Sequence, residues 1–188
     1  MPRLGVVIAS VRKGRAGGPV ADWFIEVART HGGFEMEVVD LKEWALPLLE
    51  EPVHPRLHQY ESEKTRQWSA AISALDAFAI VTPEYNYSSP PALVNAIDHL
   101  FTEWNCKAAG LVSYGGISGG LRAAQMTRTL LAAVKIVPIV EAVALPMVSQ
   151  QIDKASGAFK ASAAQEKSAI VMLDELRRWT GALAALRV

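Results

Sequence analysis

The segment with the clearest chemistry is "SVRKGRAGG", residues 10–18. It contains a hydroxyl at Ser10, basic side chains at Arg12, Lys13 and Arg15, and glycines that let backbone N–H groups approach a ligand. The helix expected to follow adds partial positive charge and unpaired donors, so one phosphate can be held without a metal. The segment matches neither G-x-G-x-x-G nor G-x-x-x-x-G-K-[ST], which favours a monophosphate over a pyrophosphate or a magnesium-bound triphosphate. The alternative is a basic turn that is only solvated.

A second segment, "TPEYNYSSPP" at 82–91, lies between an apolar run and a helical pattern. Its backbone groups and the Asn86 amide can face the edge of a planar heterocycle while Tyr85 or Tyr87 packs on the ring. The alternative is a tight turn whose tyrosines cover neighbouring side chains. We expect Ser88 or Ser89 to cap the helix that the two prolines begin.

The third segment, "SYGGISGGLRA" at 113–123, has four glycines within six residues. Gly115 and Gly116 allow the backbone to lie against a ligand, and Ser118 is expected to be the N-cap of the next helix. A ligand that needs a phosphate clamp, a loop at a heterocycle edge and a glycine-lined wall, with no metal residues nearby, fits flavin mononucleotide (FMN).

The elements that would position these segments alternate along the chain. Apolar runs predict strands at 4–10, 36–41, 77–82, 108–114 and 136–145, and helical patterns occupy 19–31, 62–75, 90–104, 119–134 and 162–186. Continuously apolar strands indicate a parallel sheet covered on both faces, which is a three-layer α/β/α sandwich with Rossmann-like or flavodoxin-like strand order. Both orders place a ligand at the carboxyl ends of the strands, where the three segments lie.

Composition restricts the class of protein. The 188 residues are 51% hydrophobic, which suits one domain spanning 1–188, and 19 basic residues balance 19 acidic ones, so no nucleic-acid or membrane partner is expected. Cys106 is the single cysteine and is expected to be a small buried hydrophobe in a reducing cytoplasm. The N-terminus does not resemble a signal peptide, and the longest apolar region is interrupted by charge and proline, so no membrane span is expected.

Taken together and in this order, the three segments resemble the NADPH-dependent FMN reductase family, which includes flavodoxin-like quinone, chromate and azo-dye reductases. The resemblance covers most of residues 3–145 and is specific at T-P-E-Y-N-x-S-x-P-x-x-L-x-N-A-I-D. It implies an α/β fold, a flavodoxin-like three-layer α/β/α sandwich with a five-stranded parallel sheet in the order 2-1-3-4-5. It also implies non-covalent FMN and a homodimer or homotetramer.

By position, the resemblance implies FMN contacts in all three segments. The phosphate would contact Ser10, Arg12, Arg15, Ala16 and Gly17. The isoalloxazine would contact Pro83, Glu84, Tyr85, Asn86 and Tyr87, and its other edge Ser113, Tyr114, Gly115 and Gly116. The family usually has glycine where this chain has Ala9, and we expect that methyl group to crowd the phosphate turn and weaken FMN affinity.

The implied activity is that of an NADPH-dependent (or NADH-dependent) oxidoreductase. Hydride passes to flavin N5 and then, in a ping-pong sequence, to a small-molecule acceptor: a quinone, a flavin, an azo dye or a metal oxyanion. No side chain is expected to act as a nucleophile, and no metal is expected. The alternative is a non-enzymatic flavin-binding electron carrier or redox-sensing module, but a balanced net charge lacks the acidic docking face typical of such carriers.

The connection after the second strand, about 20 residues long, is expected to be a lid or a dimer arm. Its His54 and His58 lack a third ligand at metal-site spacing. A preference for NADPH needs a basic residue at the 2′-phosphate, and Arg56, Arg122 and Arg128 are the candidates.

Overall fold

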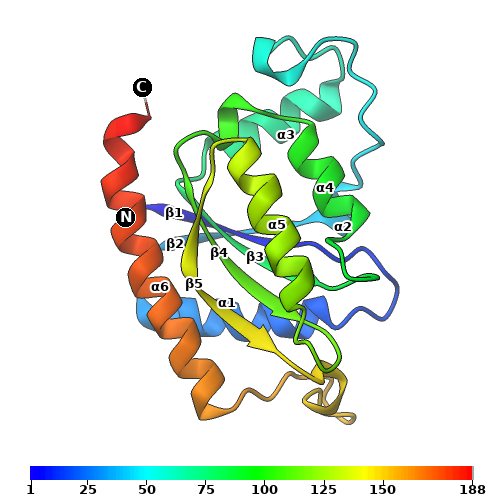
Figure 1. Ribbon diagram of the computed structural model, residues 1–188, viewed down its shortest axis with the longest axis vertical. Coiled ribbons are helices and arrows are strands. Elements are labelled where there is room, and N and C mark those ends of the chain that lie inside the picture. The colour runs from blue at the N-terminus through cyan, green and yellow to red at the C-terminus, as the bar shows by residue number, and fades with distance from the viewer. Residues whose placement is uncertain (188) are drawn as a thin grey trace.

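The structure is a computed structural model and describes residues 1–187. Within these residues five parallel strands form one sheet in the order β2-β1-β3-β4-β5 (Figure 1). The strands are β1 (Arg3–Ile8), β2 (Glu35–Asp40), β3 (Ala77–Pro83), β4 (Ala108–Tyr114) and β5 (Val137–Leu145). This order confirms the flavodoxin-like arrangement and rules out the Rossmann-like order that the periodicity alone left open.

Burial along the strands follows their place in the sheet. The central strands β3 and β4 are buried at every residue, whereas the edge strands β2 and β5 carry exposed positions. The β4–β5 register shifts between Ala109 and Leu111. Beside this irregularity the Arg128 guanidinium donates to the carbonyl oxygens of Ile139 and Val140. Arg128 thus satisfies acceptors on the edge strand, and its side chain already has partners.

Helices cover both faces of the sheet (Figure 1). The helices are α1 (Gly17–His31), α2 (Leu41–Trp44), α3 (Glu63–Ser73), α4 (Pro91–Asp98), α5 (Leu121–Ala133) and α6 (Ala163–Leu183). Side chains of α1 and α6 pack with one face in one buried cluster, and those of α2, α3, α4 and α5 pack with the other face in a second cluster. The three predicted layers are therefore present, and the two cores are separated by the sheet.

Several predicted ends of strands and helices differ from those in the structure. The strand expected at 4–10 ends at Ile8, which leaves residues 9 and 10 in the loop. The helix expected at 90–104 ends at Asp98, followed by a 3₁₀ turn at Thr102–Trp104. The short helix α2 was not predicted, because its four residues carry too little periodic signal.

No helix among residues 1–187 has both the length and the apolar character required to cross a membrane.

Candidate functional site

The loops after β1, β3 and β4 meet at the carboxyl edge of the sheet, as their strand order requires. A hydrogen bond of 2.7 Å joins the hydroxyls of Ser10 and Tyr85, which connects the first loop to the second. The Glu84 N–H donates to the Tyr114 carbonyl over 3.3 Å, which connects the second loop to the third. The structure thus brings the three sequence segments together, although they stand at residues 10–18, 82–91 and 113–123 of the chain.

In the first loop, Arg15 is held in an ion pair. Its guanidinium pairs with both carboxylate oxygens of Asp40 at the end of β2, and it donates to the Ser10 carbonyl over 2.6 Å. Burial raises the pKa of Asp40, but the hydrogen bonds from Arg15 and from the Lys42 N–H outweigh it and hold that pKa below its usual value. Arg15 therefore braces the loop, and Arg12 and Lys13 remain as its exposed basic side chains.

Asp40 was missed by sequence reasoning. Its signal was present, because a carboxylate stands near the end of the second predicted strand, 36–41, and so reaches the same edge of the sheet as the basic loop.

The amino terminus of α1 is open to an anion. The helix begins with Gly17 and Gly18, its N-cap residue Ala16 makes no side-chain hydrogen bond, and its first turn carries no acidic residue. A β-carbon on Gly17 would lie 2.6 Å from the Tyr114 hydroxyl, so that hydroxyl is pressed against the start of the helix. Unpaired N–H groups at a helix start, without a competing carboxylate, form an anion site.

Ala9 does not face this site. Its side chain is fully buried in the core cluster on the α3, α4 and α5 face, whereas α1 lies on the opposite face. The methyl group therefore packs in the core, and the expected crowding of the phosphate turn has no support in this geometry.

The second loop is a tight turn with left-handed backbone. Tyr85 and Ser88 exchange backbone hydrogen bonds of 3.0 and 2.9 Å, and Asn86 and Tyr87 between them have φ values of 50° and 67°. Two successive positive φ angles define a type I′ turn, which asparagine tolerates and tyrosine does not favour. Strained backbone of this kind is concentrated at ligand sites.

The two tyrosines of this turn have different surroundings. The Tyr85 hydroxyl bonds to Ser10, whereas Tyr87 is 66% exposed and its ring centroid lies 3.7 Å from the Arg122 Cζ. Tyr87 is thus the tyrosine available to cover a planar ring. The predicted caps at Ser88 and Ser89 are wrong: Pro90 is the N-cap of α4, and the Ser89 hydroxyl bonds with Thr127 instead.

A buried carboxylate connects the second and third loops. The Glu84 side chain is only 7% exposed and accepts from the Arg122 Nε over 2.7 Å and from the Ser118 hydroxyl over 3.0 Å. The hydrogen bond from Arg122 holds the pKa of Glu84 below its usual value against the opposing effect of burial. Arg122, one candidate for a 2′-phosphate, is therefore already paired within the site.

The predicted N-cap at Ser118 is wrong, because its hydroxyl serves Glu84 while Gly120 occupies the N-cap position. Gly120 has φ +80° and lies against the Tyr114 backbone, so this glycine is required by packing. Gly116, by contrast, has no atom within 4 Å of the place where a β-carbon would stand. Gly116 is therefore the glycine of this loop whose surface is open to a ligand.

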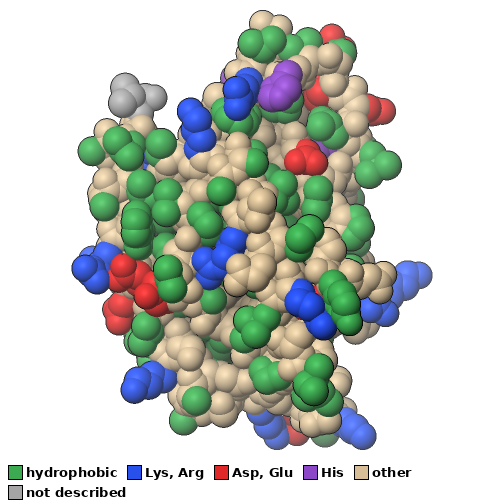
Figure 2. Space-filling model, in the orientation of Figure 1, with side chains coloured by type: hydrophobic (Ala, Val, Ile, Leu, Met, Phe, Trp, Pro, Cys, Tyr) green, Lys and Arg blue, Asp and Glu red, His purple; other side chains and the backbone are tan. Residues whose placement is uncertain are grey.

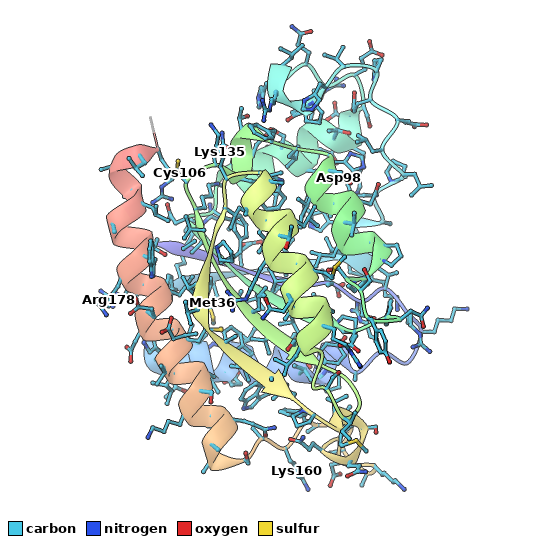
Figure 3. All side chains as sticks on the ribbon, viewed as in Figure 1. Met36, Asp98, Cys106, Lys135, Lys160 and Arg178 are labelled. Atoms are coloured by element: carbon cyan, nitrogen blue, oxygen red, sulfur yellow. The ribbon has the colours of Figure 1, made fainter. Side chains whose placement is uncertain are left out.

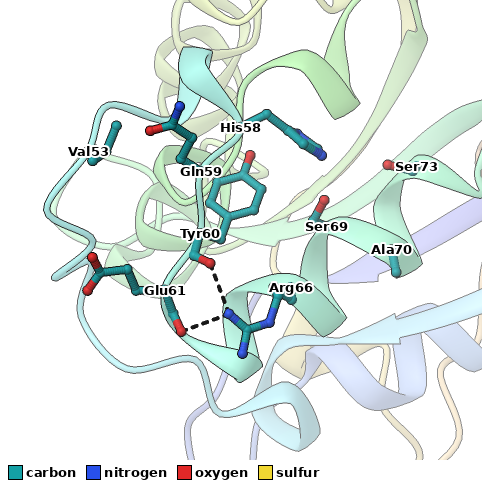
Figure 4. A pocket seen from close by; sticks show the side chains of 9 residues that line it. All are labelled: Val53, His58, Gln59, Tyr60, Glu61, Arg66, Ser69, Ala70 and Ser73. Carbon is teal, nitrogen blue, oxygen red and sulfur yellow. Dashed lines mark hydrogen bonds between the residues drawn. The ribbon is translucent and has the colours of Figure 1, made fainter.

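The long connection after α2, residues 45–62, is here called the arm. The Asn95 side chain holds it at one end, accepting from the Leu49 N–H over 2.9 Å and donating to the Pro47 carbonyl over 2.7 Å. At the other end a cavity of about 620 Å³ opens between the arm and α3 (Figure 4). Here the buried Glu103 carboxylate accepts from the hydroxyls of Tyr60 and Ser69 over 2.8 and 2.6 Å. The arm is thus fixed to the body at both ends.

The single cysteine lies far from the three loops. Cys106 is half-buried, not buried as predicted, and it stands beside Lys135 at the amino ends of β4 and β5 (Figure 3). Its N–H donates to the Lys135 carbonyl, and both residues have positive φ. The thiol therefore takes no part in the carboxyl-edge site.

Comparison with known proteins points in the same direction as the geometry. Residues 2–150 match the sequence profile of a family described as NADPH-dependent FMN reductase. The chain is 37% identical over 148 residues to an NAD(P)H-dependent FMN reductase of Schizosaccharomyces pombe, covering 77% of this chain and 74% of that protein. It is 40% identical over 131 residues to an NAD(P)H-dependent FMN reductase of Saccharomyces cerevisiae, covering 62% and 67%.

Among solved structures, the fold is similar to that of FerB, a flavoenzyme NAD(P)H:(acceptor) oxidoreductase from Paracoccus denitrificans. The TM-score is 0.75 at 22% identity, over 97% of this chain and 98% of that one.

Proposed function

The chain belongs to the NADPH-dependent FMN reductase family, and on that premise we propose that it binds FMN across the three loops and passes electrons from NAD(P)H to a small-molecule acceptor. The family, the oxidoreductase class and FMN with NAD(P)H, all expected from the sequence, are confirmed by the comparisons. The acceptor, the reaction order and the residue roles given below are our proposals.

The observation that carries the proposal is the start of α1. A helix amino terminus without a side-chain cap or an acidic first turn lies beside a loop with exposed Arg12 and Lys13. Figure 2 shows basic side chains projecting from the edge of the molecule where Figure 1 places the loop after β1. These features suit the phosphate monoester of FMN, since N–H donors and exposed cationic side chains together neutralise a dianion.

We assign the remaining loops to the ring system. The Asn86 amide and the backbone of the type I′ turn would contact one edge of the isoalloxazine, and Tyr87 would cover part of its face. The Ser113–Gly116 backbone would contact the other edge, with Gly116 providing the open surface. The ion pair of Glu84 with Arg122 would keep these two loops at a fixed separation.

When bound, FMN would supply the redox chemistry, taking a hydride equivalent from NAD(P)H and giving it up to the acceptor in alternating half-reactions. The chain's own task is orientation and charge. Backbone N–H groups at the turn would stabilise negative charge that develops on the ring edge, and no side chain is required as a nucleophile. An exposed site accepts quinone, azo, flavin or metal-oxyanion acceptors alike.

The test is a visible spectrum. The purified chain is reconstituted with FMN, desalted and mixed anaerobically with NADPH in a stopped-flow instrument. Retained colour that bleaches on the timescale of turnover supports the reductase. Retained colour that NADPH leaves unchanged would favour the alternative, a flavin-binding carrier or sensor module, and loss of colour on desalting would count against a bound cofactor.

Two further expectations concern the whole molecule. We propose that residues 1–188 act as one FMN-binding domain and assemble as a homodimer or homotetramer in the cytoplasm. Exposed apolar side chains on the third loop, α5 and β5 support assembly, namely Ile117, Leu121, Met126 and Val140. Light scattering on the purified chain would give the mass directly, and a monomeric mass at micromolar concentration would refute the oligomer.

A further inference from the structure

Tyr114, whose backbone we assign to the isoalloxazine edge, has its hydroxyl beside the start of α1. The residue ends β4, and its ring runs beneath the sheet edge to the start of α1, where the hydroxyl would touch a β-carbon on Gly17 at 2.6 Å. The residue is only 4% exposed, and it belongs to the core cluster on the α1 and α6 face. The hydroxyl is therefore a fixed, buried group placed at the amino terminus of a helix.

This hydroxyl has no hydrogen-bond partner among residues 1–187. Buried polar side-chain atoms are nearly always paired, so an unpaired one in a native site indicates a missing partner or ligand. Two polar side chains of the first loop already have other partners: the Ser10 hydroxyl is bonded to Tyr85, and Arg15 is bonded to Asp40 and to the Ser10 carbonyl.

The indole N–H of Trp23 is also buried without a partner, but its surroundings differ. The Trp23 ring packs edge-on against Phe24 and Phe159 within the core. The Tyr114 hydroxyl, in contrast, lies beside Gly17 at the start of α1, directly after the loop that carries Arg12 and Arg15. The unpaired donor at Tyr114 is therefore the one that faces an anion site.

Resting on the function proposed above, we infer that the Tyr114 hydroxyl is a ligand of the flavin phosphate and makes this chain select FMN over riboflavin. The chemistry fits a phosphate monoester. Burial raises the pKa of the Tyr114 hydroxyl, so the group is a neutral O–H donor at neutral pH. A phosphate dianion can accept hydrogen bonds from this hydroxyl and from the N–H groups of α1 together. Riboflavin ends in a hydroxyl and lacks that negative charge.

Gly17 leaves room for the Tyr114 hydroxyl because it has no side chain. A methyl group there would stand within 2.6 Å of the hydroxyl and within 3.5 Å of Ile8 Cγ2. Any residue larger than glycine would thus fill the space between the hydroxyl and the first turn of α1. The glycine keeps the donor in contact with the helix start from which the phosphate would be bound.

The experiment compares flavin affinities in wild type and in Tyr114→Phe, by quenching of flavin fluorescence with FMN and, separately, with riboflavin. A hydrogen bond to a charged group corresponds to an affinity change of about 10-fold to 100-fold. We expect Tyr114→Phe to raise the Kd for FMN by about that factor and to leave the Kd for riboflavin unchanged. The matched control is Tyr60→Phe, which removes a tyrosine hydroxyl at the arm and should leave both constants unchanged.

Gly17→Ala provides a second variant that keeps the tyrosine, with thermal melting curves recorded for each protein. It should show the same selective loss for FMN, because its methyl group displaces the hydroxyl. If folded Tyr114→Phe retains the wild-type ratio of FMN to riboflavin affinity, or if both affinities fall equally, the inference is overturned while the proposed function stands. If wild type binds neither flavin, the proposed function fails as well.

Discussion

Replacing Gly120 by alanine should destabilise the chain strongly, because the glycine of the third loop is built into the backbone packing. A β-carbon at this position would lie 2.7 Å from the Tyr114 nitrogen, 2.8 Å from the Tyr114 oxygen and 3.0 Å from Ser113 Cβ. The first two atoms are backbone atoms of a central strand and have little freedom to move. The residue also has φ +80°, a region that side-chain-bearing residues disfavour by about 1–2 kcal/mol.

The expected magnitude follows from these two contributions. Overpacking of a rigid interior costs about 1–3 kcal/mol, so with the backbone strain the free energy of unfolding should fall by about 2–5 kcal/mol. For a chain of this size, each kcal/mol lowers Tm by about 2–4 °C. Gly120→Ala should therefore melt about 4–20 °C below wild type in a thermal scan followed by circular dichroism.

The matched control is Gly116→Ala, four residues earlier in the same loop. No atom lies within 4 Å of a β-carbon there, so the change in unfolding free energy should stay within about 0.5 kcal/mol. The same variant should weaken FMN binding, because it places a methyl group on the surface that we assign to the flavin. Equal melting temperatures for Gly120→Ala and Gly116→Ala would refute the steric argument.

Three further substitutions test the charged contacts. Asp40→Asn should lower the unfolding free energy by about 1–3 kcal/mol at neutral pH, because it removes the negative charge and one of the two oxygens that accept from Arg15. Since the folded-state pKa of Asp40 is lowered, its stabilising contribution is complete above its unfolded pKa of about 4 and is lost as the pH falls through the folded value. Urea melts of both proteins from pH 7 to pH 2 should therefore converge at the acid end, and a constant difference would contradict the ion pair. Glu84→Gln should loosen the second loop from Arg122, seen as faster limited proteolysis near residues 84–88 and weaker FMN binding; unchanged cutting would count against the connection. Glu103→Gln should release the arm at a cost of about 1–3 kcal/mol, since the 1%-exposed carboxylate accepts several hydrogen bonds, and proteolysis confined to 45–62 would report it.

Local patterns in the sequence were sufficient to predict the three layers and the edge of the sheet at which the candidate site lies. The apolar runs predicted at 77–82 and 108–114 are central strands buried at every position, because a parallel strand covered on both faces has no polar side to display. Once those runs are strands, the polar segments after them must lie together at one edge. The three loops of the site can therefore be identified from the order of apolar and polar segments alone.

Helix caps were the least predictable local feature. Ser118 and Ser89 have the residue type of an N-cap, yet their hydroxyls bond with Glu84 and Thr127 from other elements. A serine near a helix start has several acceptors within reach, and only the fold determines which of them is nearest. The same reasoning applies to Asn95, whose amide belongs to the family-like motif but fastens the arm.

What the sequence determined by itself is the alternation of strands and helices, because periodicity records which side of each element is buried. What only the tertiary structure decided is the partner of each polar group. The Arg15–Asp40 pair, 25 residues apart, and the approach of Tyr114 to Gly17 both depend on strand order, which periodicity leaves open. Hydrogen bonds and ion pairs act over about 3 Å, so a one-position change in strand order would separate these partners although the alternation of strands and helices along the chain stayed the same.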